Sequence, residues 1–177
     1  MSDPDREHNH ERWIQAYNRM LERVKHALEE AEEHTLPKLG QAVDWAKEHA
    51  VELGELTRNE AEKVGEYVKR DLHDAGEYLS ESSTDLRGWL RFDLELIEGQ
   101  LLELFSKAAD KTSMEWAALR RRMDQAARYH TGEVTGPGSL ECMACGEVMA
   151  FHRTGHIPPC PRCHGTVFER PHRRRAS

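Results

Sequence analysis

Four cysteines in the last third of the chain have a spacing that predicts metal chemistry. They form two C-x-x-C pairs, Cys142/Cys145 and Cys160/Cys163, in the pattern C-x2-C-x14-C-x2-C. Two residues between cysteines let one tight turn aim both sulfurs at a single point, and two such turns can surround one ion. Four thiolates at about 2.3 Å around Zn²⁺ make the closed tetrahedral site of structural zinc. We therefore expect one structural zinc ion.

The residues around the pairs fit such turns. Gly146 follows the first pair, where a positive φ angle is expected, and Pro161 stiffens the turn of the second pair. A module of about thirty residues cannot bury enough apolar area to fold alone. Structural zinc supplies roughly 10–16 kcal/mol of folding free energy in small zinc peptides. We therefore expect metal binding to supply the free energy that folds this module.

Three other roles of the cysteines fit the sequence less well than zinc binding does. Disulfides need an oxidising compartment, and the polar start MSDPDREHNHER is no export signal. A redox C-x-x-C normally stands alone at the start of a helix in a larger fold. Iron is the closer rival, because C-x-x-C-G and C-P-x-C turns also hold single iron atoms in rubredoxins. The short spacer and the absence of an aromatic-rich core favour zinc, with iron as a minor alternative.

Catalysis at this site is not expected. A catalytic zinc keeps an open position for water, and four sulfurs leave none. His152, His156 and His164 lie nearby in the sequence, so an exchange of ligands is conceivable, but solvated or supporting histidines are the simpler interpretation. The chain shows no nucleophile paired with a base and no phosphate-binding loop. We expect no catalytic residue and no enzyme activity.

Short strand-like segments surround the cysteines. They are Ser139–Glu141, Glu147–His152 and Thr166–Arg170, and they predict a small β ribbon over residues 140–171. Residues 129–139, with three glycines and a proline, predict a connector. Residues 172–177 form a basic tail.

Residues 1–128 have helical periodicity. In the first helix the apolar positions follow steps of four and three, as in a heptad seam: Trp13, Tyr17, Met20, Val24, Ala27 and Ala31. Pro37 should end this helix, and Gly54 should end the second. Capping boxes at Thr57–Glu60 and Thr112–Glu115 predict the starts of two more. The predicted helices are 7–35, 38–53, 58–80, 85–109 and 113–128.

The expected fold class is therefore mainly α: a long-helix bundle or coiled-coil-like hairpins, followed by a small C-terminal β zinc ribbon. Charged residues make up 32% of the 177 residues and aromatic residues only 7%, which is typical of long solvated helices. No apolar run approaches the roughly 20 residues of a membrane span. We expect a cytoplasmic protein without a membrane partner.

The chain resembles the bacterial zinc ribbon-containing protein family, the YbeL-like family. Three blocks carry the resemblance: Gly54-Glu-Leu-Thr-Arg58, Asp110-Lys-Thr-Ser-Met-Glu-Trp116, and Tyr129-His-Thr-Gly-Glu-Val134 leading into the cysteines. It covers roughly Leu53 to Pro171. The resemblance implies a charged helical region joined to a C-terminal ribbon that holds zinc. His164 departs from the pattern, because ribbons usually carry glycine after the second pair.

Charge is unevenly distributed, which bears on possible partners. The net charge is −7; residues 129–177 hold six arginines and four glutamates, a net of +2, and residues 1–128 hold the remaining 19 basic and 28 acidic residues, a net of −9. This is not the balance of a general nucleic-acid binder. Basic residues near the ribbon could still form a local anion-binding or partner surface if they converge. They are Arg120, Arg121, Arg122, Arg128, Arg153, Arg162 and Arg170, with Arg173–Arg175 in the tail.

Two functions follow as hypotheses. The first is a noncatalytic zinc-binding interaction or adaptor protein, whose ribbon presents a docking surface to a protein complex or to nucleic acid. The alternative is a helical structural protein that forms a homo-oligomer through the Trp13–Ala31 helix. In that case the ribbon only stabilises the fold.

Overall fold

The computed structural model describes residues 4–30, 39–82, 99–119 and 128–171. In these ranges the helices are α1 (Pro4–Glu30), α2 (Leu39–Glu52), α3 (Arg58–Ser82) and α5 (Gly99–Leu119). The strands that follow are β1 (Tyr129–His130), β2 (Val134–Thr135), β3 (Gly138–Cys142), β4 (Val148–Phe151), β5 (Gly155–His156) and β6 (Val167–Glu169). The mainly α class with a small C-terminal β region is confirmed. No helix of the described ranges is long and apolar enough to cross a membrane.

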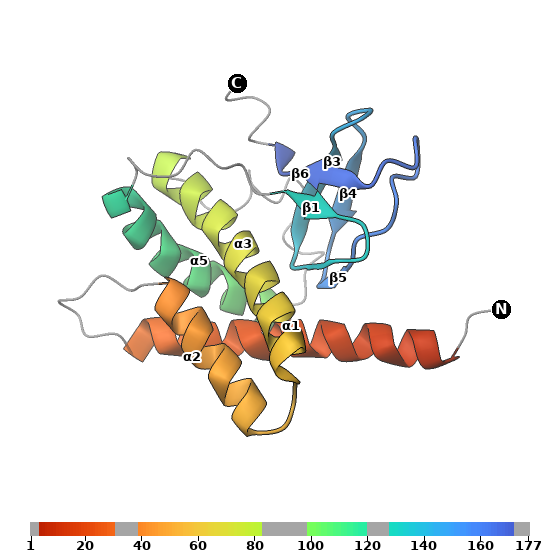
Figure 1. Ribbon diagram of the computed structural model, residues 1–177. Helices are drawn as coiled ribbons and strands as arrows, with labels where there is room; N and C mark the ends of the chain where they lie inside the picture. The colour runs from red at the N-terminus through yellow and green to blue at the C-terminus, as the bar shows by residue number, and fades with distance from the viewer. Residues whose placement is uncertain (1–3, 31–38, 83–98, 120–127, 172–177) are drawn as a thin grey trace.

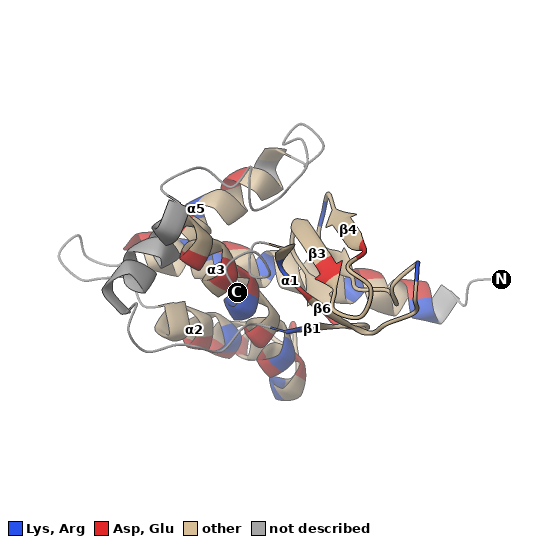
Figure 2. Ribbon diagram, turned by 90° about the horizontal axis from the view of Figure 1, so that it is seen from above, with Lys and Arg blue, Asp and Glu red and all other residues tan. Residues whose placement is uncertain are grey.

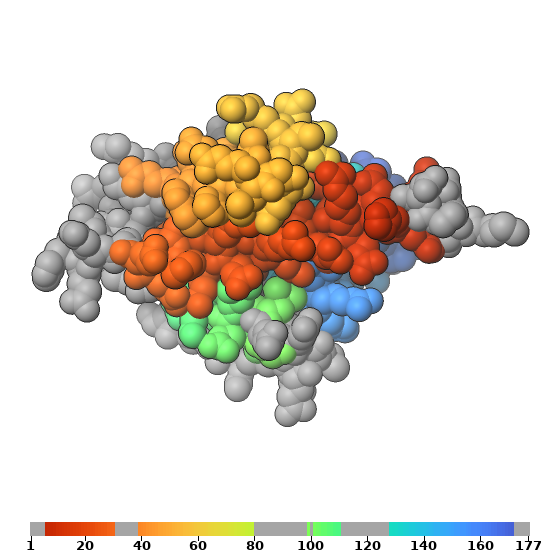
Figure 3. Space-filling view, turned by 90° about the horizontal axis from the view of Figure 1, so that it is seen from below, coloured from red at the N-terminus to blue at the C-terminus, as the bar shows by residue number. Residues whose placement is uncertain are grey.

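Helix α1 packs against each of the other described helices. It contacts α2, α3 and α5, and Figure 3 shows it running across one face between α2 and α3 on one side and α5 on the other. The heptad seam predicted along this helix supplies the packing, because Tyr17, Met20 and Val24 are almost completely buried. Ala31, the last seam position, lies outside the described residues. These three seam side chains are thus already covered within one chain, whereas Trp13 and Ala27 are half-buried.

The first helix–helix connection that the structure describes follows the local sequence signals. Helices α2 and α3 begin and end within two residues of the predicted ranges. The capping box at the start of α3 is formed: the Glu60 N–H donates to Thr57 Oγ1 at 3.3 Å, and the Thr57 N–H donates to Glu60 Oε2 at 2.9 Å. The bond from the Thr57 backbone lowers the pKa of Glu60. Pro37 and the end of the first helix lie outside the described residues.

One long helix, α5, corrects the prediction of two shorter ones. It runs from Gly99 to Leu119 without a break at residues 110–112, where helices 85–109 and 113–128 were expected to part. The Thr112–Glu115 pattern suggested a new start, but the same residues are tolerated inside a helix, and no glycine or proline interrupts residues 100–119. The predicted start at residue 85 and residues 120–127 lie outside the described residues, and Arg128, the predicted end of the last helix, is not helical.

The ribbon contains a four-stranded antiparallel sheet with the order β1-β6-β3-β4, and β2 pairs with β5. Phe168 on β6 lies at its centre, opposite Tyr129 on one side and Cys142 on the other. These side chains form a second buried core with Leu140, Ile157 and Cys160. Figure 2 shows that charged residues are frequent along the helices, whereas the strands are mostly uncharged.

Residues 129–139 are part of the ribbon rather than a connector. They carry β1, β2 and the start of β3, and Gly132, Gly136 and Pro137 lie in the turns between these short strands. The backbone at Gly136 passes so close to the helices that an added Cβ would lie 2.7 Å from the Tyr17 hydroxyl oxygen. Val134 belongs to the helical core itself. The segment that was predicted as a connector therefore packs between the helices and the rest of the ribbon.

A buried polar cluster centred on Asp71 of α3 fixes this junction. One carboxylate oxygen of Asp71 accepts hydrogen bonds from the Gly136 N–H at 2.8 Å, from the Thr135 hydroxyl at 3.2 Å and from the Tyr17 hydroxyl. The other lies 3.5 Å from Nη2 of Arg170. The same oxygen lies 3.4 Å from Nε of Arg70. Asp71 and Arg170 are both fully buried, and the two guanidinium groups together compensate the buried charge of Asp71.

Arg170 completes the cluster from the ribbon side. Its Nε lies 3.9 Å from Asp74, a second fully buried carboxylate on α3. It also donates to the Tyr129 hydroxyl at 3.1 Å and to the Ser139 carbonyl at 3.2 Å. The guanidinium groups of Arg70 and Arg170 lie 4.0 Å and 4.7 Å from the centre of the Tyr129 ring. Burial raises the pKa of Tyr129, which keeps its phenol neutral.

Replacing Arg170 tests the importance of this cluster. Arg170→Met removes the ribbon's cation from the buried Asp71 and Asp74 and leaves Asp71 with Arg70 of its own helix, so we expect the free energy of unfolding to fall by about 3 kcal/mol. Urea denaturation of the metal-loaded protein measures this. Arg153→Met, an exposed arginine of the same ribbon, should change it by less than about 0.5 kcal/mol. Equal effects of the two substitutions would contradict the role assigned to Arg170.

Candidate metal centre

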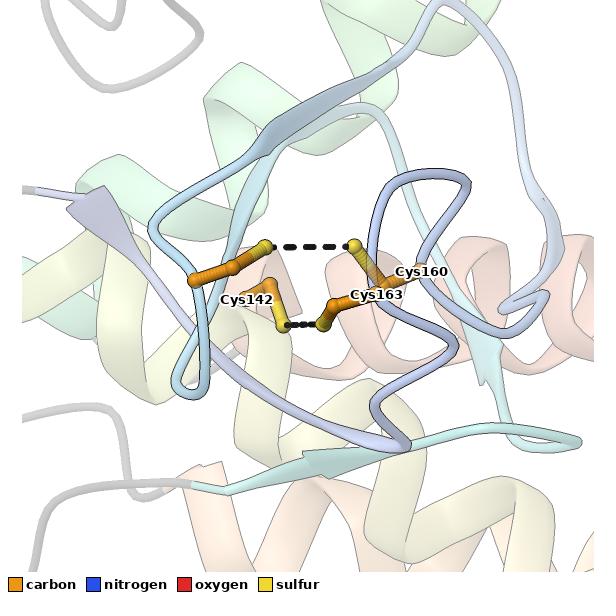
Figure 4. Close-up of side chains that lie close together, drawn as sticks. Cys142, Cys160 and Cys163 are labelled. Atoms are coloured by element: carbon orange, nitrogen blue, oxygen red, sulfur yellow. Dashed lines mark hydrogen bonds between the residues drawn. The ribbon is translucent and has the colours of Figure 1, made fainter.

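The four cysteine sulfurs lie together between two turns of the ribbon. Cys142 ends β3 and Cys145 lies in the next turn, while Cys160 and Cys163 occupy the turn before β6. All four Sγ atoms lie within 4.8 Å of one another. Two of the separations, Cys142 to Cys163 and Cys145 to Cys160, are 3.6 Å (Figure 4). The two predicted C-x-x-C pairs therefore converge on one point, as the spacing of the cysteines indicates.

These separations fit a tetrahedral metal site. Ligands at about 2.3 Å from a central ion stand about 3.8 Å apart, close to the 3.6 Å observed. A disulfide would need the two sulfurs at about 2.05 Å, and all four cysteines are free. Soft thiolate ligands in this geometry suit zinc or iron. The donor set fits one four-coordinate ion that holds both turns.

The two turns repeat the same backbone hydrogen bonds. In each, the residue after the second cysteine donates its N–H to the carbonyl of the first: Gly146 to Cys142 and His164 to Cys160, both at 2.9 Å. The N–H of each first cysteine donates in return to the carbonyl two residues after the second, at 2.8 Å and 2.9 Å. We call these turns the first and second knuckle, residues 142–147 and 160–165.

The repeat explains the unusual residue at position 164. Gly146 has a φ angle of 76° and His164 a φ angle of 61°, so both occupy the left-handed region. Glycine adopts this conformation freely, as predicted for Gly146, whereas another L-residue is disfavoured there by roughly 1–2 kcal/mol. His164 therefore keeps the turn that glycine would make, with some strain.

Electrostatics favours a cation among the sulfurs. Burial acts to raise the pKa of Cys160, but the backbone N–H groups of Cys163 and Arg162 and the neighbouring thiols lower it to about 7. The Gly165 N–H, 3.4 Å from the Cys163 sulfur, acts to lower the pKa of Cys163, but the neighbouring thiols and burial raise it to about 12. Four thiolates this close repel one another, so a divalent cation is needed to hold all of them deprotonated.

Gly165 is a site residue that sequence reasoning missed. A Cβ at this position would lie 3.0 Å from the Cys142 sulfur and 3.2 Å from the Cys163 sulfur. The bare backbone can therefore approach two sulfurs and donate its N–H to one of them. The signal was available in the Cys-His-Gly sequence, in which the glycine stands one place later than in the first knuckle.

The histidines near the cysteines are not ligands in this arrangement. Among the described residues, the four cysteines are the cluster found with metal-ligand geometry. His152 and His164 are exposed. The ring nitrogens of His156 lie instead 3.3 Å from the Gly132 carbonyl and 3.2 Å from the His10 carbonyl. Four thiols can thus fill the coordination sphere of one tetrahedral ion.

The arginines predicted as a partner surface are divided by the fold. Arg128 donates to the sulfur of Met143 in the first knuckle. Arg162 lies in the second knuckle, with Nη1 3.9 Å from a Glu147 carboxylate oxygen. Arg153 follows β4 at the end of the β3–β4 pair opposite Cys142. Arg120, Arg121, Arg122 and the tail arginines lie outside the described residues.

Arg170 is a correction, because it was predicted at the surface and is fully buried. It stands two residues beyond Phe168, so the alternation of an extended strand turns it toward the same covered face. Its partner Asp71 could have been noticed in the sequence. A carboxylate there lies in the middle of the apolar stripe formed by Val64, Val68 and Ala75.

Removal of one ligand tests the four-sulfur assignment. Cys145→Ser should lose the single bound ion and the ordered ribbon, because three thiolates do not close the site. Metal analysis and the absorption spectrum of the Co²⁺-substituted protein report the stoichiometry and the tetrahedral sulfur ligands. Met143→Ser, in the same knuckle, should keep both signals. Retention of one tightly held, tetrahedral ion by Cys145→Ser would refute the assignment.

Opposite substitutions at the two left-handed positions should have opposite effects. His164→Gly relieves strain and should raise the free energy of unfolding of the metal-loaded protein by about 1 kcal/mol, and Gly146→Ala should lower it by about the same amount. Thermal and urea unfolding measure both variants. A shift of the same sign in both would show that the two knuckles are not equivalent.

Comparison with known proteins agrees with this geometry. The protein named Uncharacterized protein YbeL of Escherichia coli strain K12 is 27% identical over 128 residues, which cover 72% of this chain and 79% of the relative. The YbeL proteins of strains CFT073 and O157:H7 match to the same extent. No solved structure matches significantly. Residues 26–172 match the family described as "Zinc-ribbon containing domain". Because this match spans most of the chain, the protein belongs to that zinc-ribbon family, as the three sequence blocks indicated.

Proposed function

We propose that the protein is a noncatalytic zinc-binding interaction protein. One structural zinc ion holds the ribbon in the shape that docks on the helices, and the ribbon then presents a surface to a protein complex or to nucleic acid. The observation that carries the proposal is the link, through one strand, between the four-sulfur site and the buried Arg170–Asp71 pair. Such an arrangement holds parts of a molecule together and offers no reacting position.

The link runs through strand β6. Cys142 on β3 lies opposite Phe168, and Arg170 follows two residues later. A metal ion that fixes both knuckles therefore also fixes the strand that carries Arg170 to Asp71. Without the ion, the module has too little core to stay folded. Arg170 would then no longer hold its charge against Asp71 and Asp74 in the junction, so we expect the ribbon to separate from the helices.

The second knuckle is the part of the ribbon best placed to meet a partner. Residues 161–164 are exposed, whereas Cys142 and Cys160 are buried. The Arg162 side chain is 67% exposed and only loosely paired with Glu147. Arg128 adds a second exposed basic group beside the first knuckle. Together these residues form the knuckle face, a small positive surface on a protein of net negative charge.

Hydrogen exchange tests the link between metal and helices. Removing the ion with a chelator should increase amide exchange in the ribbon, at Gly136, and along α3 around Asp71, because the docked ribbon no longer covers that helix. Mass spectrometry of peptides from the loaded, stripped and reloaded full chain measures this. Adding zinc back should restore protection. Loss of protection in the knuckles with α3 unchanged would contradict the proposal.

A charge-reversed variant tests the knuckle face. Full-length protein is recovered with its bound partners from its native cell, alongside Arg128→Glu/Arg162→Glu and the matched control Arg153→Glu at the other end of the sheet. We expect the double variant to lose partners that the control keeps. Nuclease treatment and salt titration separate nucleic acid from protein partners. Identical recovery by all three forms would exclude the knuckle face as the docking surface.

A further inference from the structure

A groove of about 700 Å³ lies where the helices meet the ribbon. One wall comes from α1 and α3, and the other from the ribbon turns around Gly132 and Pro158. The groove is separate from the metal and from the knuckle face. Its volume falls within the range of about 300–1,000 Å³ that holds small ligands in proteins.

The lining of this groove is aromatic and carries an unbalanced positive charge. Trp13 of α1 and Tyr67 of α3 contribute half-buried rings. The lining includes Lys63 and no carboxylate, although the chain has a net charge of −7. Within the described part of the chain, Lys63 is exposed and has no ion pair. The groove therefore combines flat apolar rings with a cation that has no acidic partner.

Two carboxylates close to Lys63 and Tyr67, those of Glu60 and Glu133, are held by arginines. Arg12 pairs with Glu60 at 2.9 Å. Glu133 lies close to Tyr67, but Arg70 holds its carboxylate. An anion entering the groove would thus meet the lysine without displacing an existing salt bridge.

A histidine pair holds the two walls in place. The rings of His10 on α1 and His156 on β5 are stacked with centroids 4.2 Å apart. The His156 ring nitrogens also lie within hydrogen-bond distance of the His10 and Gly132 carbonyls, so one side chain bridges helix and ribbon. The groove is therefore built by side chains from both parts and adds two more aromatic faces to its lining.

We propose that the groove binds a nucleoside phosphate. The base stacks against the aromatic side chains, as bases do on protein rings, and the phosphate pairs with Lys63. A free mononucleotide and one nucleotide of a single strand offer the same chemistry. The inference rests on the proposed function, because the zinc-dependent, docked ribbon supplies one wall of the groove. It gives that function a chemical class of ligand.

Calorimetric titration of the full, zinc-loaded chain with adenosine monophosphate, uridine monophosphate and adenosine tests this. We expect at least one monophosphate to bind, and adenosine to bind about fivefold more weakly than its monophosphate. Lys63→Gln should weaken monophosphate binding about fivefold and leave adenosine binding unchanged. Lys69→Gln, on the same helix but outside the groove, should behave as the unsubstituted protein. Trp13→Leu should weaken all binding tenfold or more, with folding checked by circular dichroism and zinc content.

A short single-stranded oligoadenylate distinguishes the two sources of ligand. Tighter binding of the oligonucleotide than of the monophosphate, with loss at high salt, identifies a single strand; equal or weaker binding identifies the free nucleotide. Binding of neither monophosphate, or equal binding by Lys63→Gln and the unsubstituted protein, overturns the inference. In that case the proposed function still stands if chelation separates the ribbon from the helices. If chelation leaves the ribbon docked, the proposed function fails instead.

Discussion

The buried contact of Arg170 with Asp71 and Asp74 is the interaction on which the rest of the structure depends. All three side chains are completely shielded from solvent, and they come from opposite parts of the molecule. A buried ion pair adds little stability compared with a well-packed apolar contact, but breaking it is costly because the remaining charge stays unpaired. This asymmetry favours one docking geometry, since a shifted ribbon would take the Arg170 charge away from both buried carboxylates of α3. The contact therefore determines the position of the ribbon on the helices more than it determines the stability of the protein.

The metal centre and this junction depend on each other through short strands. The ribbon core is small, with Phe168 between Tyr129 and Cys142, and it contributes too little apolar burial to hold β6 alone. The free energy of metal binding supplies what the core lacks, and β6 carries that order to Arg170. The knuckle face and the groove around Trp13 and Lys63 then share one requirement. Both exist only while the ribbon is folded, and the groove also requires it to be docked.

What could be predicted from the sequence was local. The spacing of the cysteines placed four sulfurs together, Gly146 has the left-handed conformation expected of it, and Thr57 and Glu60 form their capping box. Each depends on residues a few positions apart, where the geometry of one turn decides the outcome. The continuous helix through Thr112 was missed because a cap pattern does not by itself require a helix end. The position of Arg170 was missed because it depends on Asp71 in a distant helix, which single-residue exposure rules do not include.

The most direct test of this account is the zinc affinity of Arg170→Met, measured by competition with a chelator of known affinity. If metal binding and docking are coupled, docking strengthens zinc binding by the same factor by which zinc strengthens docking, so a variant that no longer docks must bind zinc more weakly. We predict that Arg170→Met binds zinc at least tenfold more weakly than the unsubstituted protein, although Arg170 touches no sulfur, while Arg153→Met binds it unchanged. Equal zinc affinity of the unsubstituted protein and both variants would show that the ribbon folds independently of its docking on the helices. That result would contradict the coupling between metal binding and docking.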